Sequence, residues 1–227
     1  MFKWYLDILF TVLVRPILFY TKLPPGEWED ESLTFCGINC WILALFATLV
    51  IFINQLIPVG ATLVEGITGF KLLLISPVML VLAFMFFVIV YSILGGVFMV
   101  LFISLFYVLG ALMYWGGRIL GGKGQYLQNL KTSLYSSAVI LVGIFPILMI
   151  LLSKRGILDF TNYKIGYNIV YSFAVLYLYG LDAIAIRKTQ KVLKWQAFVA
   201  ALLPAILLIV LGMVVAKMLP RLANWIT

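Results

Sequence analysis

Asp182 is the side chain best suited to take part in chemistry, because it is the one acidic residue inside an apolar segment of this chain. A carboxylate within a membrane segment predicts a proton or cation site. The same side chain could instead form a salt bridge to Arg187 or Lys188, or extend along its helix to the membrane interface. Both interpretations are open at this level.

Other polar side chains also fall within apolar segments. Asn54 and Gln55 lie near the end of the first such segment, and Tyr171 and Tyr177 lie deep in the fifth. Amides in membranes hydrogen-bond across helices, and phenols in hydrocarbon need partners, so we expect these groups to face the helical bundle. The alternative is that they line a polar pathway or ligand cavity together with Asp182.

Catalytic and metal-binding residues are not predicted. The chain has no histidine, and no serine or cysteine has a plausible base beside it. Cys36 and Cys40 are one helical turn apart, which suits neither a relaxed disulfide nor a metal site without a second cysteine pair. We therefore expect no catalytic residue, no metal and no cofactor.

The glycine-rich stretch 116–124 resembles a phosphate loop only in its glycine content, because it lacks the Lys-Ser/Thr ending and the preceding strand. We expect a sharp interfacial turn that contacts lipid phosphates. Basic residues on this turn and near residue 190 form the candidate cytoplasmic face: Arg118, Lys123, Arg187, Lys188, Lys191 and Lys194.

Composition indicates which elements position these residues. Hydrophobic residues make up 65% of the 227 positions and charged residues 11%, a balance that excludes a soluble domain. The formal charge of +8 is explained by membrane topology and anionic headgroups rather than by nucleic acid, because the basic residues lie between apolar runs. Membrane lipids are the expected partners.

The apolar pattern predicts an all-α, polytopic bundle over residues 33–227. About 20 apolar residues cross a bilayer. The stretch from Lys71 to Arg118 is about twice that length, so we predict two helices joined by a tight turn at Tyr91–Gly96. The six predicted spans cover about 33–57, 72–90, 97–115, 130–152, 167–186 and 195–219.

Residues 1–32 are predicted to form an interfacial helix and an acidic loop. Lys3, Asp7, Thr11 and Arg15 recur every four residues and make one polar stripe on a helix with apolar sides. Pro16 should break this helix. The acidic loop, with Glu27, Glu29, Asp30 and Glu31, is interpreted as solvated, and a cation or a basic partner is the alternative.

The number of spans decides the orientation. Six spans give eight basic residues on each side, whereas five spans with a cytoplasmic N-terminus give ten against six. The charge rule therefore favours five spans, while the length of the apolar segments favours six. We prefer six on length.

Short motifs carry a resemblance to a known family. Leu120-Gly121-Gly122-Lys123-Gly124 precedes the pair Tyr135-Ser136 and the in-span Pro146, and the N-terminal segment contains Arg15-Pro16 followed by aromatics. At comparable spacings these motifs resemble the Yip family, the Ypt/Rab-interacting multi-span proteins, and Ser76-Pro77 is similar to the Gly-Pro that opens the family's first span. The resemblance implies a five-helix core over about 71–219, with the first segment as an addition. The N-terminal Asp-Leu-Tyr-Gly-Pro motif is missing, so the likeness is to prokaryotic members.

These observations predict a non-enzymatic integral membrane protein of a prokaryotic cytoplasmic membrane. It would act as a scaffold or adaptor in membrane organisation or trafficking, with a membrane-protein partner or a second copy of itself. The alternative is a small transporter or channel for ions or amphipathic molecules, with Asp182 on the path.

Overall fold

The computed structural model of the protein describes residues 2–23, 31–65, 67, 70–154 and 156–226, and the described residues are helical or in short connections. In chain order the elements are α1 (Phe2–Val14), α2 (Pro16–Thr21), α3 (Leu33–Ile51), the π-helical turn η2 (Phe52–Leu56), α4 (Ile57–Val64), α5 (Phe70–Ile119), α6 (Tyr126–Ser136), the 3-10 segment η3 (Ser137–Gly143), α7 (Ile144–Lys154), α8 (Phe160–Gln190) and α9 (Lys194–Ile226). The prediction of an all-α protein is confirmed for this part of the chain.

Within the described residues, five helical stretches are long and apolar enough to cross a membrane: Leu33–Thr62, Leu74–Ile119, Tyr126–Lys154, Phe160–Gln190 and Lys194–Met218. The first runs through α3, η2 and α4, and the third runs through α6, η3 and α7. Their lengths and compositions are those of membrane-spanning helices. The count is five rather than the six predicted from segment length.

The predicted turn at Tyr91–Gly96 is wrong, because α5 runs without a break from Phe70 to Ile119. A glycine inside a helix costs only about 1 kcal/mol relative to alanine, which does not end a helix on its own. Gly95 is also useful where it lies: a Cβ atom there would come within 2.3 Å of the Trp41 ring. Glycine at 95 therefore lets α3 and α5 approach closely, and the helix continues through the contact.

Two prolines have different effects on their helices. Pro16 separates the N-terminal helices as predicted, since α1 ends at Val14 and α2 begins at Pro16. The predicted helix end before Pro58 is wrong, and α4 continues to Val64. The preceding π-helical turn explains this. The Ile57 amide donates to the Phe52 carbonyl five residues back, so the hydrogen-bond pattern of the helix changes just before the proline.

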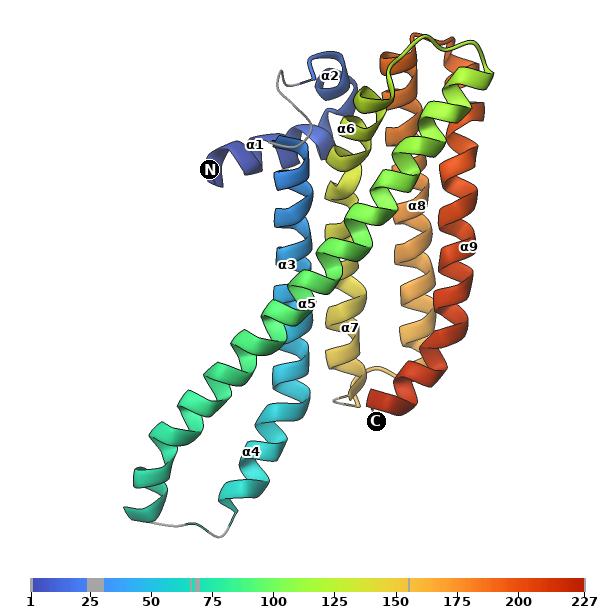
Figure 1. The fold of residues 1–227 in the computed structure, drawn as a ribbon. Helices are drawn as coiled ribbons and strands as arrows, with labels where there is room; N and C mark the ends of the chain where they lie inside the picture. The colour runs from blue at the N-terminus through green and yellow to red at the C-terminus, as the bar shows by residue number, and fades with distance from the viewer. Residues whose placement is uncertain (1, 24–30, 66, 68–69, 155, 227) are drawn as a thin grey trace.

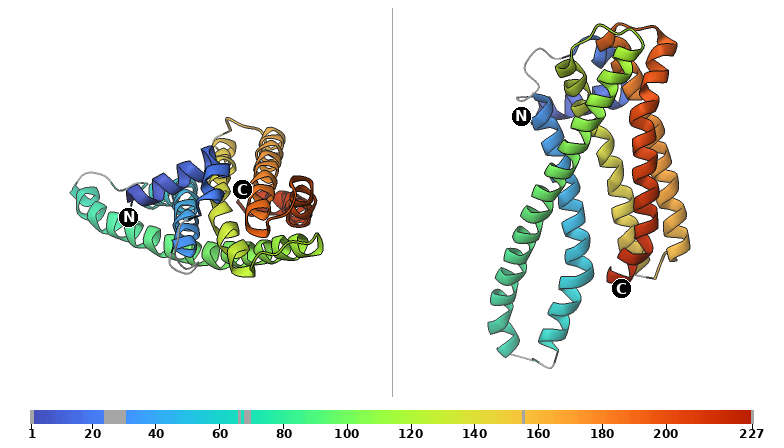
Figure 2. Two further views of the ribbon diagram at one scale, coloured as in Figure 1. Left: turned by 90° about the horizontal axis from the view of Figure 1, so that it is seen from above. Right: turned by 45° about the vertical axis from the view of Figure 1, so that its right-hand side comes forward.

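The helices form a bundle with a separate projection (Figure 1). α6 packs against α3, α5 and α8, while α8 and α9 lie side by side and α5 crosses α3 and contacts α9. The helices α1 and α2 lie across the end of the bundle that also holds the α5–α6 and α8–α9 connections. The first half of α5 and α4 extend away from α7, α8 and α9 in both views of Figure 2.

Candidate functional site

The junction of α6 and η3 is the most polar part of the bundle interior. Every residue from Asn129 to Val139 is buried, and this run includes six hydroxyl or amide side chains between Asn129 and Ser137. From Asn129 onward α6 is enclosed by α3, α5 and α8, whereas Leu127 in its first turn is exposed. Buried polar groups of this kind need hydrogen-bond partners, and these come from the N-terminal helices and from α8.

Asp182 belongs to the first of two hydrogen-bonded sets at this junction. The carboxyl is 2% exposed and is hydrogen-bonded to the Ser136 side chain. The Ser136 oxygen lies 2.8 Å from the Tyr20 hydroxyl and donates to the Thr132 carbonyl at 3.2 Å. This set fastens α2 to α6 and α8.

The expectation that Asp182 pairs with Arg187 or Lys188, or reaches the interface, is wrong. Arg187 and Lys188 are exposed, whereas Asp182 is buried toward α2 and α6. On an α-helix with 3.6 residues per turn, side chains five and six positions apart point in directions more than about 100° apart. The basic residues therefore face away from the aspartate although they are near it in sequence.

Asn39 organises the second set. The Tyr5 hydroxyl donates to Asn39 Oδ1 at 2.6 Å, and Asn39 Nδ2 donates to Ser137 Oγ at 3.0 Å. Asn39 and Ser137 are fully buried and Tyr5 is nearly so. The free thiols of Cys36 and Cys40 are buried beside this set.

An aromatic cluster closes the space below α1 and α2. The Tyr135 ring packs edge-on against Phe19 at 4.9 Å between centroids and also against Phe35, which contacts Tyr5. The Tyr135 hydroxyl donates to Glu31 Oε2 at 3.2 Å, and Glu31 is the part of the acidic loop that lies within the described residues. The predictions for Glu27, Glu29 and Asp30 fall outside those residues.

The ionisation of Tyr5 and Tyr20 should affect how tightly the N-terminal helices are held at this junction. Burial raises the pKa of Tyr5 to about 12, and burial also raises the pKa of Tyr20, against the effect of its Ser136 hydrogen bond. A phenol whose pKa is higher in the folded state stabilises that state fully below its unfolded pKa of about 10. That contribution is lost as the pH rises above 10, so α1 should loosen between pH 10 and 12.

The measurement is the mobility of a nitroxide at Lys3→Cys, which is exposed on α1. We expect the label to become mobile between pH 10 and 12 and to recover on return to pH 8. Tyr5→Phe should flatten part of this pH dependence, because phenylalanine cannot ionise. An identical transition after Tyr5→Phe and Tyr20→Phe together would show that these phenols do not control the contact.

The basic residues of the candidate cytoplasmic face meet at one end of the bundle. They lie at the end of α5, in the α5–α6 connection, at the end of α8 and at the start of α9, and all six are exposed: Arg118, Lys123, Arg187, Lys188, Lys191 and Lys194. Arg118 also lies 5.9 Å from the Tyr114 ring centroid. The order of the apolar segments predicted that these residues lie on the same side of the membrane, and the structure has them at the same end of the bundle.

The glycine-rich connection holds a side chain rather than a phosphate. The Gly124 amide donates to Gln190 Oε1 at 2.9 Å, and the Lys123 amide donates to the Gln190 carbonyl at 3.1 Å. The amides of Gly121 and Gly122 bond to Arg118 and Gly117 carbonyls. With these four amides bonded inside the protein, any phosphate contact here falls to the exposed basic side chains.

The other predicted site residues are spread over the bundle. Tyr171 donates to the Leu208 carbonyl on α9 at 2.5 Å, and Tyr177, which is 38% exposed, donates to the Leu13 carbonyl of α1. Asn54 and Gln55 lie in η2, beyond the C-terminal end of α3 and away from the polar junction, and Gln55 is exposed. The structure therefore brings Tyr177 to the N-terminal helices but does not join Asp182, Asn54 and Tyr171 in one site.

Among the described residues, four open pockets with volumes of about 290 to 690 Å³ are walled mainly by apolar side chains. The largest lies between α5, η3, α8 and α9, and Tyr171 lines it. Asp182, Asn54 and Tyr177 line none of these four. Among the described residues, no three His, Cys, Asp or Glu side chains gather in a way that could hold a metal ion.

Sequence reasoning missed the partners of Asp182. Tyr20 and Ser136 appear only as parts of the two motifs that carry the family resemblance, the Arg-Pro start and the Tyr-Ser pair. The structure brings these motifs into contact at 2.8 Å. Comparison of the chain with protein-family models, with curated proteins and with solved structures finds no match.

Proposed function

We propose that the protein is a non-enzymatic, multi-pass membrane protein of the Yip type that acts as a scaffold or adaptor in membrane organisation. One observation carries the proposal: Asp182 is used inside the bundle to hold the N-terminal helices, through Ser136 and Tyr20, rather than to line a polar cavity. The contact between Tyr20 and Ser136 also joins the two motifs of the family resemblance.

The proposed membrane placement puts α1 in the interface. The residues Tyr5, Ile8 and Val12 of α1 face the protein, the stripe from Lys3 to Arg15 is largely exposed, and Leu6, Phe10 and Val14 form an exposed apolar stripe next to it. A helix with these three faces suits the boundary between headgroups and lipid tails. α1 would then lie along the membrane surface while the five spans cross it.

We place the end with α1 in the cytoplasm of a prokaryotic cell. With five spans, ten of the sixteen Lys and Arg residues belong to the N-terminal segment, the α5–α6 region and the α8–α9 region. The positive-inside rule favours this orientation. The exposed basic face would bind anionic lipid headgroups there, at about 1 kcal/mol for each Lys or Arg near the surface.

The transport alternative keeps one supporting observation, a buried carboxyl with two hydroxyl groups near it in the membrane region. The experiment that separates the two functions is proton and sodium flux into proteoliposomes. We expect a rate equal to that of protein-free vesicles, for the natural chain and for Asp182→Asn alike. A gradient-driven flux that Asp182→Asn abolishes would contradict the scaffold proposal and establish Asp182 on a transport path.

A further inference from the structure

The helices that project from the bundle have a surface with no partner in this chain. We define the arm as residues 52–64, which include η2 and α4, together with residues 70–94 of α5 (Figures 1 and 2). None of the residues from 74 to 94 of α5 is buried, whereas nine residues of α3 are. The exposed side chains of the arm are large and apolar, among them Val78, Leu80, Val81, Phe84 and Ile89.

Lipid tails are too short to cover this surface. Residues 72–117 of α5 contain no Asp, Glu, Lys or Arg, and at 1.5 Å per residue they extend about 69 Å. Membrane helices tilt by up to about 40°, and at that tilt the stretch still rises about 50 Å, whereas the hydrocarbon core is about 30 Å thick. The stretch is therefore longer than the tails can cover, and the arm is the part of it that extends past the ends of α7, α8 and α9 in Figure 1.

The arm also has an apolar groove. This groove, of about 630 Å³ and open to the outside, lies between its two helices, with Phe52, Leu56, Met79, Ala83 and Phe86 in its walls. Protein interiors are normally filled to the density of organic crystals, so an apolar space of this size favours the entry of another apolar group. We call this groove the hollow, and we call the exposed side chains Val78, Val81, Phe84 and Ile89 of α5 the ridge.

Gln55 marks the outer surface of the arm as an interface. Its amide is exposed on η2 and has no hydrogen-bond partner among the residues that the structure describes. An amide in a membrane helix is stabilised when it bonds to another helix. A second Gln55, related by a two-fold axis, would supply both the donor and the acceptor.

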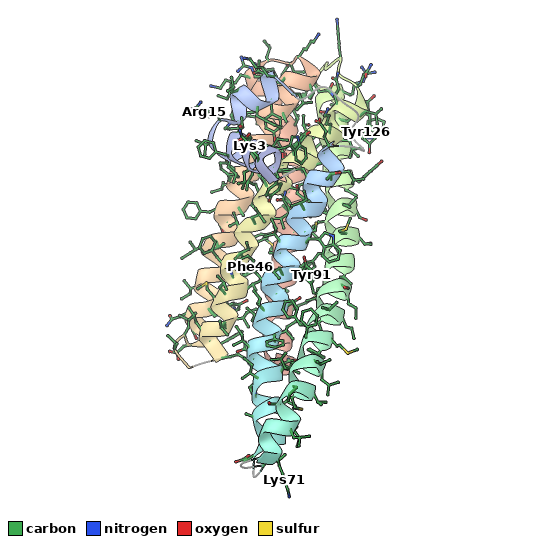
Figure 3. All side chains as sticks on the ribbon, turned by 90° about the vertical axis from the view of Figure 1, so that its left-hand side faces the viewer. Lys3, Arg15, Phe46, Lys71, Tyr91 and Tyr126 are labelled. Atoms are coloured by element: carbon green, nitrogen blue, oxygen red, sulfur yellow. The ribbon has the colours of Figure 1, made fainter. Side chains whose placement is uncertain are left out.

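We propose that two copies of this chain pair through their arms, each ridge filling the hollow of the other copy. The thirteen exposed large apolar residues from Ile57 to Ile93 present on the order of 1,000 Å², above the roughly 800 Å² per partner of a stable interface. The tip carries one acid, Glu65, and one base, Lys71, both exposed, so a two-fold copy meets complementary charges. Figure 3 shows Lys71 at the free end of the arm.

Cross-linking in native membranes tests the pairing. We replace Cys36 and Cys40 by alanine and compare Val81→Cys on the arm with Ile206→Cys on α9, because both side chains are 55% exposed. A short bismaleimide should give a covalent dimer with Val81→Cys and several-fold less with Ile206→Cys. Equal yields at the two positions, or monomer at both, would overturn the proposal.

Charge exchange at the tip tests the two-fold arrangement. In vesicles, resonance energy transfer between differently labelled copies should fall severalfold with Glu65→Lys or Lys71→Glu and recover in the double variant. Gln55→Leu should weaken pairing by about three- to tenfold, from the energy of one interhelical amide contact. Failure of the double variant to recover would refute complementary tips.

A lipid covering is the competing outcome. Lipid-soluble nitroxides that quench labels along the whole arm, with no energy transfer between copies, would show that lipid and not a second copy lies on the arm. The proposal rests on the membrane placement but not on the scaffold role. A failed dimer test leaves the flux result unchanged, and a positive flux result leaves the dimer intact.

Discussion

Replacing Gly124 by alanine is expected to detach the α5–α6 connection from α8 and to destabilise the protein by about 1–3 kcal/mol. A Cβ atom at this position would lie 2.4 Å from the Thr189 carbonyl oxygen and 3.0 Å from Gln190 Cδ. The first of these contacts is with backbone, which cannot move aside as a flexible side chain can. The connection must shift, and the two hydrogen bonds that Gln190 makes with Lys123 and Gly124 are then lost.

Gly96→Ala is the matched control, because a Cβ atom at Gly96 meets nothing within 4 Å. Alanine inside the continuous helix α5 should be neutral or stabilise by up to about 1 kcal/mol. The measurement is the apparent melting temperature in one detergent or nanodisc. Gly124→Ala should lower the melting temperature and Gly96→Ala should leave it unchanged or raise it, and an equal shift for both would show that the close approach at Gly124 does not constrain the fold.

Replacing Asn39 by alanine should release α1 and cost about 2–5 kcal/mol. The substitution leaves the buried hydroxyls of Tyr5 and Ser137 without their Asn39 partner. Each buried polar group left without a hydrogen bond costs about 1–3 kcal/mol, and the lost side chain also leaves a small cavity. The expected readouts are a lower melting temperature and faster proteolytic cleavage of residues 1–23 than in the natural chain.

A double-mutant cycle separates the hydrogen bonds from simple loss of packing. Tyr5→Phe removes the hydroxyl that Asn39→Ala would leave unsatisfied, so the double variant should be less destabilised than the sum of the two single variants. The expected coupling is about 1 kcal/mol or more. Additive losses would show that Asn39 contributes through its volume and not through the bond to Tyr5.

The pattern of apolar residues predicted most of the architecture. The helices from Tyr126 to Lys154, from Phe160 to Gln190 and from Lys194 onward correspond to the fourth, fifth and sixth predicted segments, with later or earlier ends. Pro16 also separates two helices where expected. These features could be predicted because hydrophobic length and the missing amide of proline act locally, whatever the neighbouring helices do.

The wrong prediction of a turn at Gly95 and Gly96 arose because the conformation there depends on a contact with a distant residue. A pair of glycines is compatible with a turn and with a helix, and the difference between the two is small in local free energy. The Trp41 ring on α3 lies where any side chain at Gly95 would project. This contact joins residues more than fifty positions apart, so no local pattern could have indicated it.

The sequence by itself determined that this chain is a helical membrane protein, because composition and helical spacing are properties of single segments. The tertiary structure decided that α5 is one helix and that Asp182 faces Ser136 and Tyr20 rather than Arg187. The physical reason is that the rotation of each helix about its axis is chosen by the packing of all its neighbours. That rotation decides which of the few polar groups meet.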